Sequence, residues 1–531
     1  MRLAQTSSAS RGAVARIFIL CFIVYAYFMP RWADWNIDSR FDLTRAIVDL
    51  HTVRIDKFHW NTWDKAVYKH HYYSDKAPGT AMLGVVVYGA FDAMRNAPGI
   101  GSGIRALEQN SAWNTPIALG RESTQLAPAA RGTVLGGCQR SGTAGNVQYI
   151  PWGNRLVPPM RNWALSKYVT TVGAVALLSA LFVAFFYWFL GFFALSASVR
   201  VVATLLYAFA TDAMPYSTVF YSHQLAAGML FTGFALTWLR RFGVIGPWAL
   251  PMAGFLFGFA FFTEYTVLLI IAVAGIYVLW TFRQRVREIA TACIAGAVPV
   301  CGVFAYNWAC FGNPLDTGYS HDFCWSSAQA AGYQGFTYPH IGPLTDLTVG
   351  PFRGLFYMSP YLLFALPGLA LMWRFRYRAE ALTCFAVAAV FILALSSYWG
   401  WNGGKVEGPR YLVPAIPFLA MPVAFSLQRS ARIPAARTLF YAAAAWSIFI
   451  VWIQFLGGEL FPISWLRDPV FDYSLPELTG NHIPPNAGMF LGLHGWHSLL
   501  PLSAALILMA MLPVRKRKKP VRAPIAVPVT Q

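Results

Sequence analysis

The feature that most constrains this chain is a series of long apolar segments, because a chain that carries many of them cannot fold as a soluble globule. A helix needs about 20 mostly apolar residues to cross a hydrocarbon core of roughly 30 Å. Charged residues make up only 12% of the 531 residues, about half their share in an average soluble domain. The sequence therefore predicts an all-α polytopic membrane protein with about 12 transmembrane helices. The predicted spans are 13–32, 167–190, 199–215, 223–239, 247–263, 265–281, 288–309, 354–373, 380–398, 411–427, 438–457 and 496–513.

Lysine and arginine are distributed unevenly between the two sides of these spans. With the N-terminus inside, the cytoplasmic segments carry 21 Lys and Arg against two acids, whereas the outer segments carry 20 against 20. The formal charge of +19 then follows the positive-inside rule, which predicts that both termini are cytoplasmic. No basic domain remains to bind nucleic acid, so that class of partner is excluded. The basic tail, 514–531, is expected to be attracted by anionic membrane lipids.

Two segments could be misassigned. Residues 79–94 are apolar enough to resemble a span, but if they crossed, 18 of the 21 cytoplasmic cations would face outward. We therefore expect an interfacial or re-entrant helix after Pro78. The first span resembles a signal peptide, but no small-residue cleavage site follows it. Residues 1–32 are expected to be a cytoplasmic tail and an uncleaved transmembrane anchor.

The polar residues collect in the outer loops. The first loop has a charged part, 33–95, in which Leu43, Ile47 and Leu50 predict an interfacial helix over 41–50. Its second part, 96–166, is rich in small residues without an apolar period, which is typical of a flexible insertion. The transmembrane region, 167–513, has further outer loops at about 310–353, 398–410 and 458–495. Cys138 and Cys324 both lie outside, and whether they form a disulfide stays open.

Short motifs mark the outer ends of the spans and are expected to face one cavity. They are Pro215–Ser217, Tyr221–His223, Glu264–Tyr265, Gly350–Gly354 and Trp399–Tyr411. Two further motifs lie in the first loop, at Asn36–Arg40 and at His71–Gly79, where the second precedes the interfacial helix. This order resembles the GT-C class of membrane glycosyltransferases, the superfamily of the protein O-mannosyltransferases and the lipid A aminoarabinose transferase. The segments 351–356 and 408–412 look like those of bacterial members, and the resemblance covers nearly the whole chain except about 96–160.

The resemblance implies roles for two residues. The aspartate that opens the first outer loop in the class maps onto Asp38, and the lysine that holds the donor phosphate maps onto Lys76. The sequence departs from the class at both places, because the usual Asp-Glu pair is Asp38-Ser39 and Lys-Pro-Pro is Lys76-Ala77-Pro78. The match is therefore to a divergent bacterial subfamily, and it does not identify the sugar.

An activity and a location are also implied by the resemblance. The protein is expected to move a hexosyl or pentosyl group, with inversion, from a polyprenyl-phosphate donor to an envelope glycan, lipid or protein acceptor. The expected location is the bacterial inner membrane, with the active site on the periplasmic side. The alternatives are an O-antigen ligase or polymerase, and a transporter or flippase of lipid-linked glycans. A transporter usually shows two matched halves with interrupted helices, and no such halves are recognisable here.

The expected reaction needs a base for the acceptor hydroxyl and cations for the departing phosphate. The candidate catalytic carboxylates are Asp38 and Asp42. The candidate phosphate-binding residues are Lys76, Arg40, Arg353 and Arg410, of which the arginines can bind phosphate with two parallel hydrogen bonds. Further candidates are Asp75, His71, Tyr73, His223 and Glu264.

Each candidate also has a structural interpretation. Asp38 could pair with Arg40 or Arg31, Lys76 could extend along an apolar surface toward water, and Arg353 and Arg410 could anchor lipid phosphates. His71 and His223 could be structural hydrogen-bonding groups. Asp38, Asp42 and His71 are suitable ligand types for a divalent cation. No ligand spacing selects a metal, so the cofactor stays open.

Overall fold

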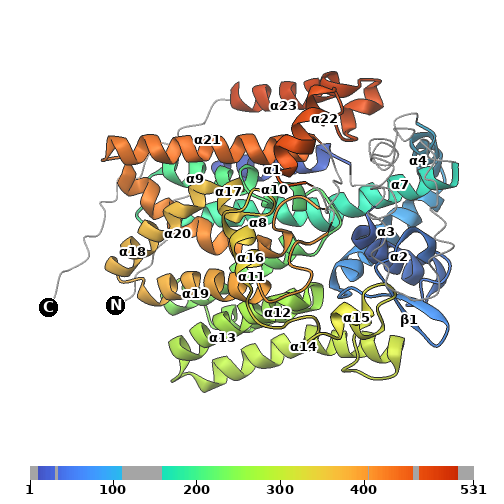
Figure 1. Ribbon diagram of the computed structural model, residues 1–531, viewed down its shortest axis with the longest axis horizontal. Coiled ribbons are helices and arrows are strands. Elements are labelled where there is room, and N and C mark those ends of the chain that lie inside the picture. The colour runs from blue at the N-terminus through green and yellow to red at the C-terminus, as the bar shows by residue number, and fades with distance from the viewer. Residues whose placement is uncertain (1–9, 30–33, 111–157, 405, 458–465, 512–531) are drawn as a thin grey trace.

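The computed structural model describes residues 10–29, 34–110, 158–404, 406–457 and 466–511. In this part the chain is a bundle of roughly parallel and antiparallel helices with one two-stranded sheet at an end (Figure 1). Most of the predicted insertion, Cys138 and the basic tail lie outside the described residues.

The bundle is built from helices that coincide with the twelve predicted spans. They are α1 (Arg11–Tyr27), α7 (Pro158–Thr171), η3 (Val172–Ala176), α8 (Leu177–Leu190), α9 (Ala197–Phe209), α11 (His223–Arg241), α12 (Ala249–Thr263), η4 (Tyr265–Val267), α13 (Leu268–Phe282), α14 (Val286–Phe311), η6 (Pro360–Phe364), α18 (Ala365–Arg374), α19 (Arg378–Leu395), η7 (Arg410–Ala415), α20 (Ile416–Ser430), α21 (Pro434–Leu456), η10 (Gly495–Leu499) and α23 (Leu500–Met511).

Length and composition identify membrane-spanning helices within this set. Among the described residues, six continuous helices are long and apolar enough to cross a membrane, and three apolar helices are shorter. The helix over 163–190 includes the π-helical turn η3, and the predicted span 354–373 consists of α17 (Leu355–Met358), η6 and α18. The prediction of an all-α polytopic membrane protein is confirmed.

The hairpin end of the bundle is the end that carries the sheet. Its elements are α2 (Trp35–Leu50), η1 (His59–Asn61), β1 (Lys65–Tyr68), β2 (His71–Ser74), α3 (Gly79–Asn96) and α4 (Ile100–Glu108). Asp34 caps α2 by accepting hydrogen bonds from the backbone N–H groups of Asn36 and Ile37, which are otherwise unpaired at a helix start. In Figure 1, α2 and α3 lie side by side beyond the ends of the bundle helices, where an interfacial helix is expected.

The sheet was not predicted. β1 and β2 pair antiparallel with Lys65 opposite Ser74 and Tyr68 opposite His71. Residues from the loop after α14 join it, because Asp322 forms a bridge with Ala66 and Phe323 N–H donates to Lys65 C=O. Each strand has four residues, too few for an alternating pattern to be recognised in sequence.

Short helical elements complete the same end. They are α10 (Ala213–Tyr216), η5 (Gly318–His321), α15 (Ser326–Gln329), α16 (Ile341–Thr348), α17, η8 (Val470–Ser474), α22 (Leu475–Thr479) and η9 (Ala487–Leu491). Gly79 allows α3 to begin directly against the end of α12, because a Cβ there would lie 2.6 Å from the carbonyl oxygen of Phe262. This contact holds the segment after β2 close to the residues that follow α12.

The opposite end of the bundle collects arginines. At the C-terminal end of α11, Arg240 pairs with Glu288 at 2.6 Å and Arg241 with Glu380 at 2.5 Å. The N-terminal residue of the same helix, His223, lies at the hairpin end. The two ends of α11 therefore belong to two different charged regions.

Candidate active site

Helix α2 has two faces of opposite charge. Residues four apart lie on one face of a helix, so Asp34, Asp38 and Asp42 form a continuous stripe, here called the acid face of α2. Arg40 lies on the opposite side of the helix. The three aspartates are at most 5% exposed, although they belong to the charged part of the first outer loop.

Asp38 forms an ion pair with Lys167 of α7. The Nζ atom of Lys167 lies 2.5 Å from Oδ1 of Asp38, and both side chains are fully buried. The second carboxylate oxygen, Oδ2, is buried and has no hydrogen-bond partner among the described residues. Burial raises the pKa of Asp38 well above its usual range, and the charge of Lys167 opposes this only in part.

The two neighbours of Asp38 on the acid face differ from each other. Asp42 accepts a hydrogen bond from Asn61 at 3.2 Å, while its Oδ2 atom is buried without a partner in the described chain. Burial raises the pKa of Asp42 to about 7. Asp34 instead accepts hydrogen bonds at both oxygens from the hydroxyl of Tyr221, each at 2.9 Å, and so connects the acid face to the bundle.

Arg410 lies on the far side of Tyr221. Its Nη1 donates to the Tyr221 hydroxyl at 3.2 Å and its Nη2 to the Tyr411 hydroxyl at 2.9 Å. The guanidinium lies over both rings, 4.7 Å from the centroid of Tyr411 and 5.5 Å from that of Tyr221. The Nε atom is buried and has no hydrogen-bond partner in the described part of the chain. Arg410 is therefore held between two tyrosines, with its buried Nε–H group unpaired among the described residues.

Gly408 allows the tight turn that precedes Arg410. Its φ is +53°, and a Cβ would lie 2.3 Å from Oδ2 of Asp212. Only glycine fits a left-handed backbone this close to a buried carboxylate.

His223 and Glu264 complete the group that we call the Arg410 cluster, which consists of Arg40, Tyr221, His223, Glu264, Arg410 and Tyr411. His223 Nδ1 lies 3.5 Å from Oε2 of Glu264. Neither ring nitrogen of His223 has a hydrogen-bond partner among the described residues. Two arginines, Arg40 and Arg410, therefore share this cluster with one carboxylate, that of Glu264.

Arg40 is positioned by the opposite face of α2. It donates to the side chain of Asn36, to the carbonyl of Ala77 and to the hydroxyl of Ser222, each at 3.1 Å. Its Nη2 lies 3.7 Å from Glu264. This set of bonds ties α2, the start of α3 and α11 together, and Arg40 is only 2% exposed.

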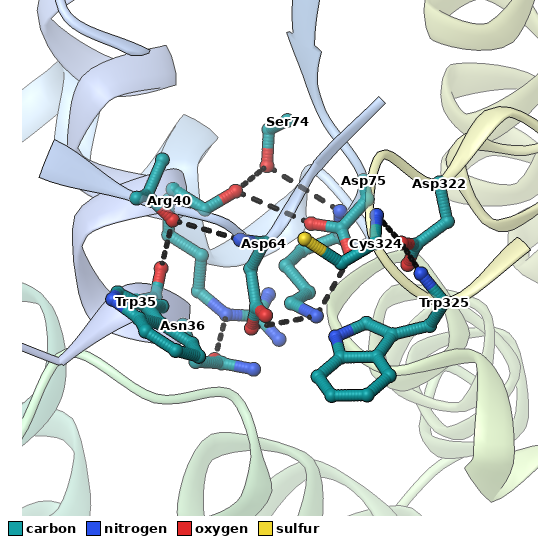
Figure 2. A network of polar contacts seen from close by, with 12 residues as sticks. Trp35, Asn36, Arg40, Asp64, Ser74, Asp75, Asp322, Cys324 and Trp325 are labelled. Atoms are coloured by element: carbon teal, nitrogen blue, oxygen red, sulfur yellow. Dashed lines mark hydrogen bonds and ion pairs between the residues drawn. The ribbon is translucent and has the colours of Figure 1, made fainter. Parts of the chain in front are cut away.

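Lys76 lies in a second group, the Lys76 network, which consists of Ser39, Asp64, Ser74, Asp75 and Lys76. Its Nζ atom is 2.9 Å from Asp64 and 2.8 Å from Asp75. Asp75 also accepts a hydrogen bond from Ser39. Figure 2 shows Asp64, Ser74 and Asp75 converging beside Arg40. Two carboxylates therefore already neutralise the charge of Lys76.

The loop after α14 adds a further carboxylate beside this network. Asp322 accepts hydrogen bonds from the backbone N–H groups of Cys324 and Trp325, and Figure 2 places these residues opposite Asp75. Burial, and then the charge of Asp75, raise the pKa of Asp322 to about 7. Cys324 is disulfide-bonded, whereas Cys21, Cys293, Cys301, Cys310 and Cys384 are free.

The remaining candidates have local partners. Arg353 is fully buried and donates to the carbonyls of Asn402, Phe352 and Gly404, so it organises the loop before Arg410. His71 lies on the exposed side of the hairpin, 2.8 Å from Asp56. Tyr73 packs its ring against Phe311 in a small apolar core.

The side chains that the sequence offers as metal ligands do not converge. Asp38 and Asp42 lie on the acid face, whereas His71 pairs with Asp56 on the hairpin. Among the described residues, no group of three or more His, Cys, Asp or Glu side chains is arranged to hold a metal ion.

Lys167 is the residue that sequence reasoning missed. It is the first residue of the predicted span 167–190, and a lysine at the start of an apolar helix is usually interpreted as an interfacial anchor. A signal was nevertheless present, since an ionisable residue in such a helix marks a functional site by default.

Comparisons with known proteins find little in sequence. No family model matches the chain, and no curated protein matches it. Two solved structures of ArnT from Cupriavidus metallidurans are similar. The apo structure has 12% identity and a TM-score of 0.43, over 87% of this chain and 72% of that one. The structure bound to undecaprenyl phosphate has 15% identity and a TM-score of 0.47, over 94% and 80%. At these values, a function has to be supported by the residues of this chain.

Proposed function

We propose that this protein is a membrane glycosyltransferase that moves a sugar from a polyprenyl-phosphate donor to an acceptor of the cell envelope. The observation that carries the proposal is the Arg410 cluster. It holds a buried Nε–H group of Arg410 and a buried histidine ring without hydrogen-bond partners in the described chain, and Arg40 lies in the same cluster, 3.7 Å from Glu264. Buried donors are almost always paired, and a phosphate monoanion or dianion is the ligand that would pair these.

The position of the cluster favours a donor that is anchored in lipid. Arg410 begins η7, which continues into α20 as one apolar helix of 21 residues. A phosphate bound there would lie at the start of a membrane-spanning segment, so an attached polyprenyl chain could remain among the apolar helices. A soluble nucleotide-sugar donor would gain nothing from that position.

Asp38 is the proposed base. It removes the proton from the acceptor hydroxyl, and the acceptor oxygen forms a bond to the anomeric carbon of the donor sugar. The bond between that carbon and the phosphate oxygen breaks, and its electron pair leaves with the polyprenyl phosphate. Attack from the side opposite the phosphate inverts the anomeric configuration. Arg410 and Arg40 neutralise the charge that develops on the leaving phosphate.

We place this site on the periplasmic side of a bacterial inner membrane, with both termini in the cytoplasm. The support is the separation of charges along the bundle, because the arginines at the far end of α11 are where the positive-inside rule expects the cytoplasm. The acceptor is an envelope glycan, lipid or protein.

The test is transfer of radiolabelled sugar from a panel of polyprenyl-phosphate donors to total envelope acceptors. Membranes that carry the wild type are compared with membranes that carry Asp38→Asn. The matched control is Asp56→Asn, which makes the same chemical change at an outer aspartate whose side chain is 42% exposed. General base catalysis contributes about 10²–10⁴-fold, so label should move with the wild type and the control and fall by at least 100-fold with Asp38→Asn.

Two results would contradict the proposal. Full activity of Asp38→Asn would move the base to another carboxylate such as Asp42. Absence of transfer from every donor would favour a ligase or a flippase, and transfer of a lipid-linked polymer would then be measured.

A further inference from the structure

A cavity of about 340 Å³ lies between α2, α3 and α7, away from the Arg410 cluster. Its walls in the described chain include Arg45 and Asp49 of α2, Tyr88, Asp92 and Arg95 of α3, and Trp163 of α7. This volume is at the low end of the range for small-molecule sites, about 300–1,000 Å³. It suits a single sugar residue better than a lipid chain or a peptide.

The cavity is connected to Asp38 by two routes. Arg45 and Asp49 lie seven and eleven residues after Asp38, so they continue the acid face of α2, and Arg45 is about 10 Å along the helix at 1.5 Å per residue. On the facing helix, the Nζ atom of Lys167 lies 4.4 Å from the ring centroid of Trp163 and also pairs with Asp38. One side chain therefore separates the cavity from the proposed base.

Among the described residues, the cavity is lined by charges of both signs. Arg45 lies 3.4 Å from Asp49, and Arg95 lies 3.8 Å from Asp92 and 3.0 Å from Glu108. In this part of the chain, two guanidinium groups thus face two lining carboxylates, with a third carboxylate behind Arg95. A phosphate or carboxylate ligand would be repelled by the acids, and a cation would meet the arginines. The cavity therefore selects an uncharged ligand.

The lining groups match a ligand that has many hydroxyls. A hydroxyl both donates and accepts hydrogen bonds, and the described walls carry acceptors on Asp49 and Asp92 and a donor on Arg45. The hydroxyl of Tyr88 donates to Asp49 at 2.9 Å, which fixes the orientation of that carboxylate. The rings of Tyr88 and Trp163 both pack edge-on against Phe41, so they form rigid apolar walls beside the polar groups.

We propose that this cavity binds an uncharged sugar residue of the acceptor, next to the residue whose hydroxyl is glycosylated. The inference rests on the proposed function, and it adds the class of acceptor and the place where it is recognised. The acid face of α2 then links two substrates, with the donor phosphate beyond Asp34 and Tyr221 and the acceptor beyond Arg45. Asp38 lies between them.

The test measures transfer at varied concentrations of an envelope acceptor extract and, separately, of the donor. The variants are Asp49→Ala, which removes a hydrogen-bond acceptor, and Asp92→Trp, which obstructs the cavity at a side chain that is 32% exposed. The control is Asp316→Ala, because Asp316 is also in a surface ion pair and has the same 25% side-chain exposure as Asp49. Both cavity variants should raise the acceptor KM at least fivefold. The donor KM and the rate at saturating acceptor should stay within twofold of the wild type.

The outcomes separate the two proposals. An acceptor KM that does not change in either variant overturns the acceptor site while transfer itself persists. A rise in donor KM instead would make the cavity part of the donor site and would also overturn it. If the wild type transfers no sugar from any donor, the proposed function fails first. Should Asp49→Ala not accumulate in membranes, Asp92→Ala replaces it, since Asp92 also lines the cavity and contacts Arg95 and Asn96 of its own helix.

Discussion

The Lys76 network and the acid face of α2 lie close together, but their buried carboxylates differ in whether their oxygens have partners. In the Lys76 network two aspartates share one lysine, and every side-chain polar atom of its members has a partner or is reached by solvent. On the acid face, Asp38 and Asp42 each keep a buried oxygen without a partner in the described chain. Satisfied buried charges fix a structure, whereas unsatisfied ones cost free energy that a function has to justify. The comparison supports the proposal that the first region is structural and the second catalytic.

The largest expected effect comes from breaking the buried ion pair of the acid face. Lys167→Met leaves the carboxylate of Asp38 buried without its cation, which should lower the free energy of unfolding by about 3–5 kcal/mol. The double variant Asp38→Asn with Lys167→Met removes both charges and should recover most of this stability, but not transfer. Thermal unfolding of the detergent-solubilised protein measures the first effect and the radiolabel assay the second.

Lys57→Met is the control for that series, because it removes an exposed lysine from the same end of the molecule. If Lys167→Met melted at the wild-type temperature, the pair would not be buried as described. Recovered transfer in the double variant would remove Asp38 from catalysis.

The next prediction distinguishes the proposed phosphate-binding role of Arg410 from the structural role of Lys76. Arg410→Ala removes a charged donor aimed at the phosphate and should raise the donor KM about 100-fold, equal to about 2.7 kcal/mol. Lys76→Met should raise the donor KM less than tenfold, but it should destabilise the protein more, because Asp64 and Asp75 lose their shared cation. Donor titrations compare the donor KM values of the two variants, and melting temperatures compare their losses of stability. The variant with the larger change in donor KM should have the smaller loss of stability.

The control for Arg410→Ala is Arg105→Ala, at an exposed position of α4. A larger donor effect for Lys76→Met than for Arg410→Ala would break the comparison between the two regions and return the phosphate to Lys76, as the sequence resemblance implies.

A pH dependence should arise from Asp42. Its pKa is about 7 in the folded protein, whereas an unfolded aspartate titrates near 3.9. Between these values the folded protein holds a proton that the unfolded chain has lost. The free energy of unfolding should therefore fall as the pH rises through this window, by at most about 1.4 kcal/mol per pH unit. Above pH 7 Asp42 is deprotonated in the folded and in the unfolded state, so this residue no longer makes the free energy of unfolding depend on pH.

Melting temperatures between pH 5 and pH 8 measure this slope, and Asp42→Asn should make it shallower because the amide does not titrate, while Asp322, whose pKa is also raised to about 7, keeps its own contribution. Asp56→Asn serves as the control at an exposed position. An equal slope in the wild type and in Asp42→Asn would show that another group is responsible.

The smallest effect is expected at His71. It is on the exposed side of the hairpin with Asp56 as its partner, and exposed ion pairs contribute at most about 1 kcal/mol. His71→Ala should change transfer by less than twofold and stability by less than about 1 kcal/mol in the same assays. A loss of activity comparable to that of Arg410→Ala would show that the hairpin belongs to the site.

The candidate residues of the sequence reach different positions in the structure. Arg40, Arg410, His223 and Glu264 do come together, since the last three each follow or begin an apolar segment and such ends meet at one side of a membrane, where α2 carries Arg40. Arg353 instead bonds to backbone carbonyls of the loop before Arg410. The partner of Asp38 is separated from it by 129 residues, and no local pattern indicates a contact at that distance.

The sequence by itself determined the polytopic helical architecture, the separation of charges between the two ends and the set of polar motifs. These are local properties, because lipid demands about 20 consecutive apolar residues whatever the rest of the chain does. Only the tertiary structure decided which carboxylates are buried, that Lys167 pairs with Asp38, that Lys76 is already neutralised and that a cavity lies beside Trp163. Burial and pairing depend on segments far apart in the chain, and their energies are set by neighbours that packing alone brings together.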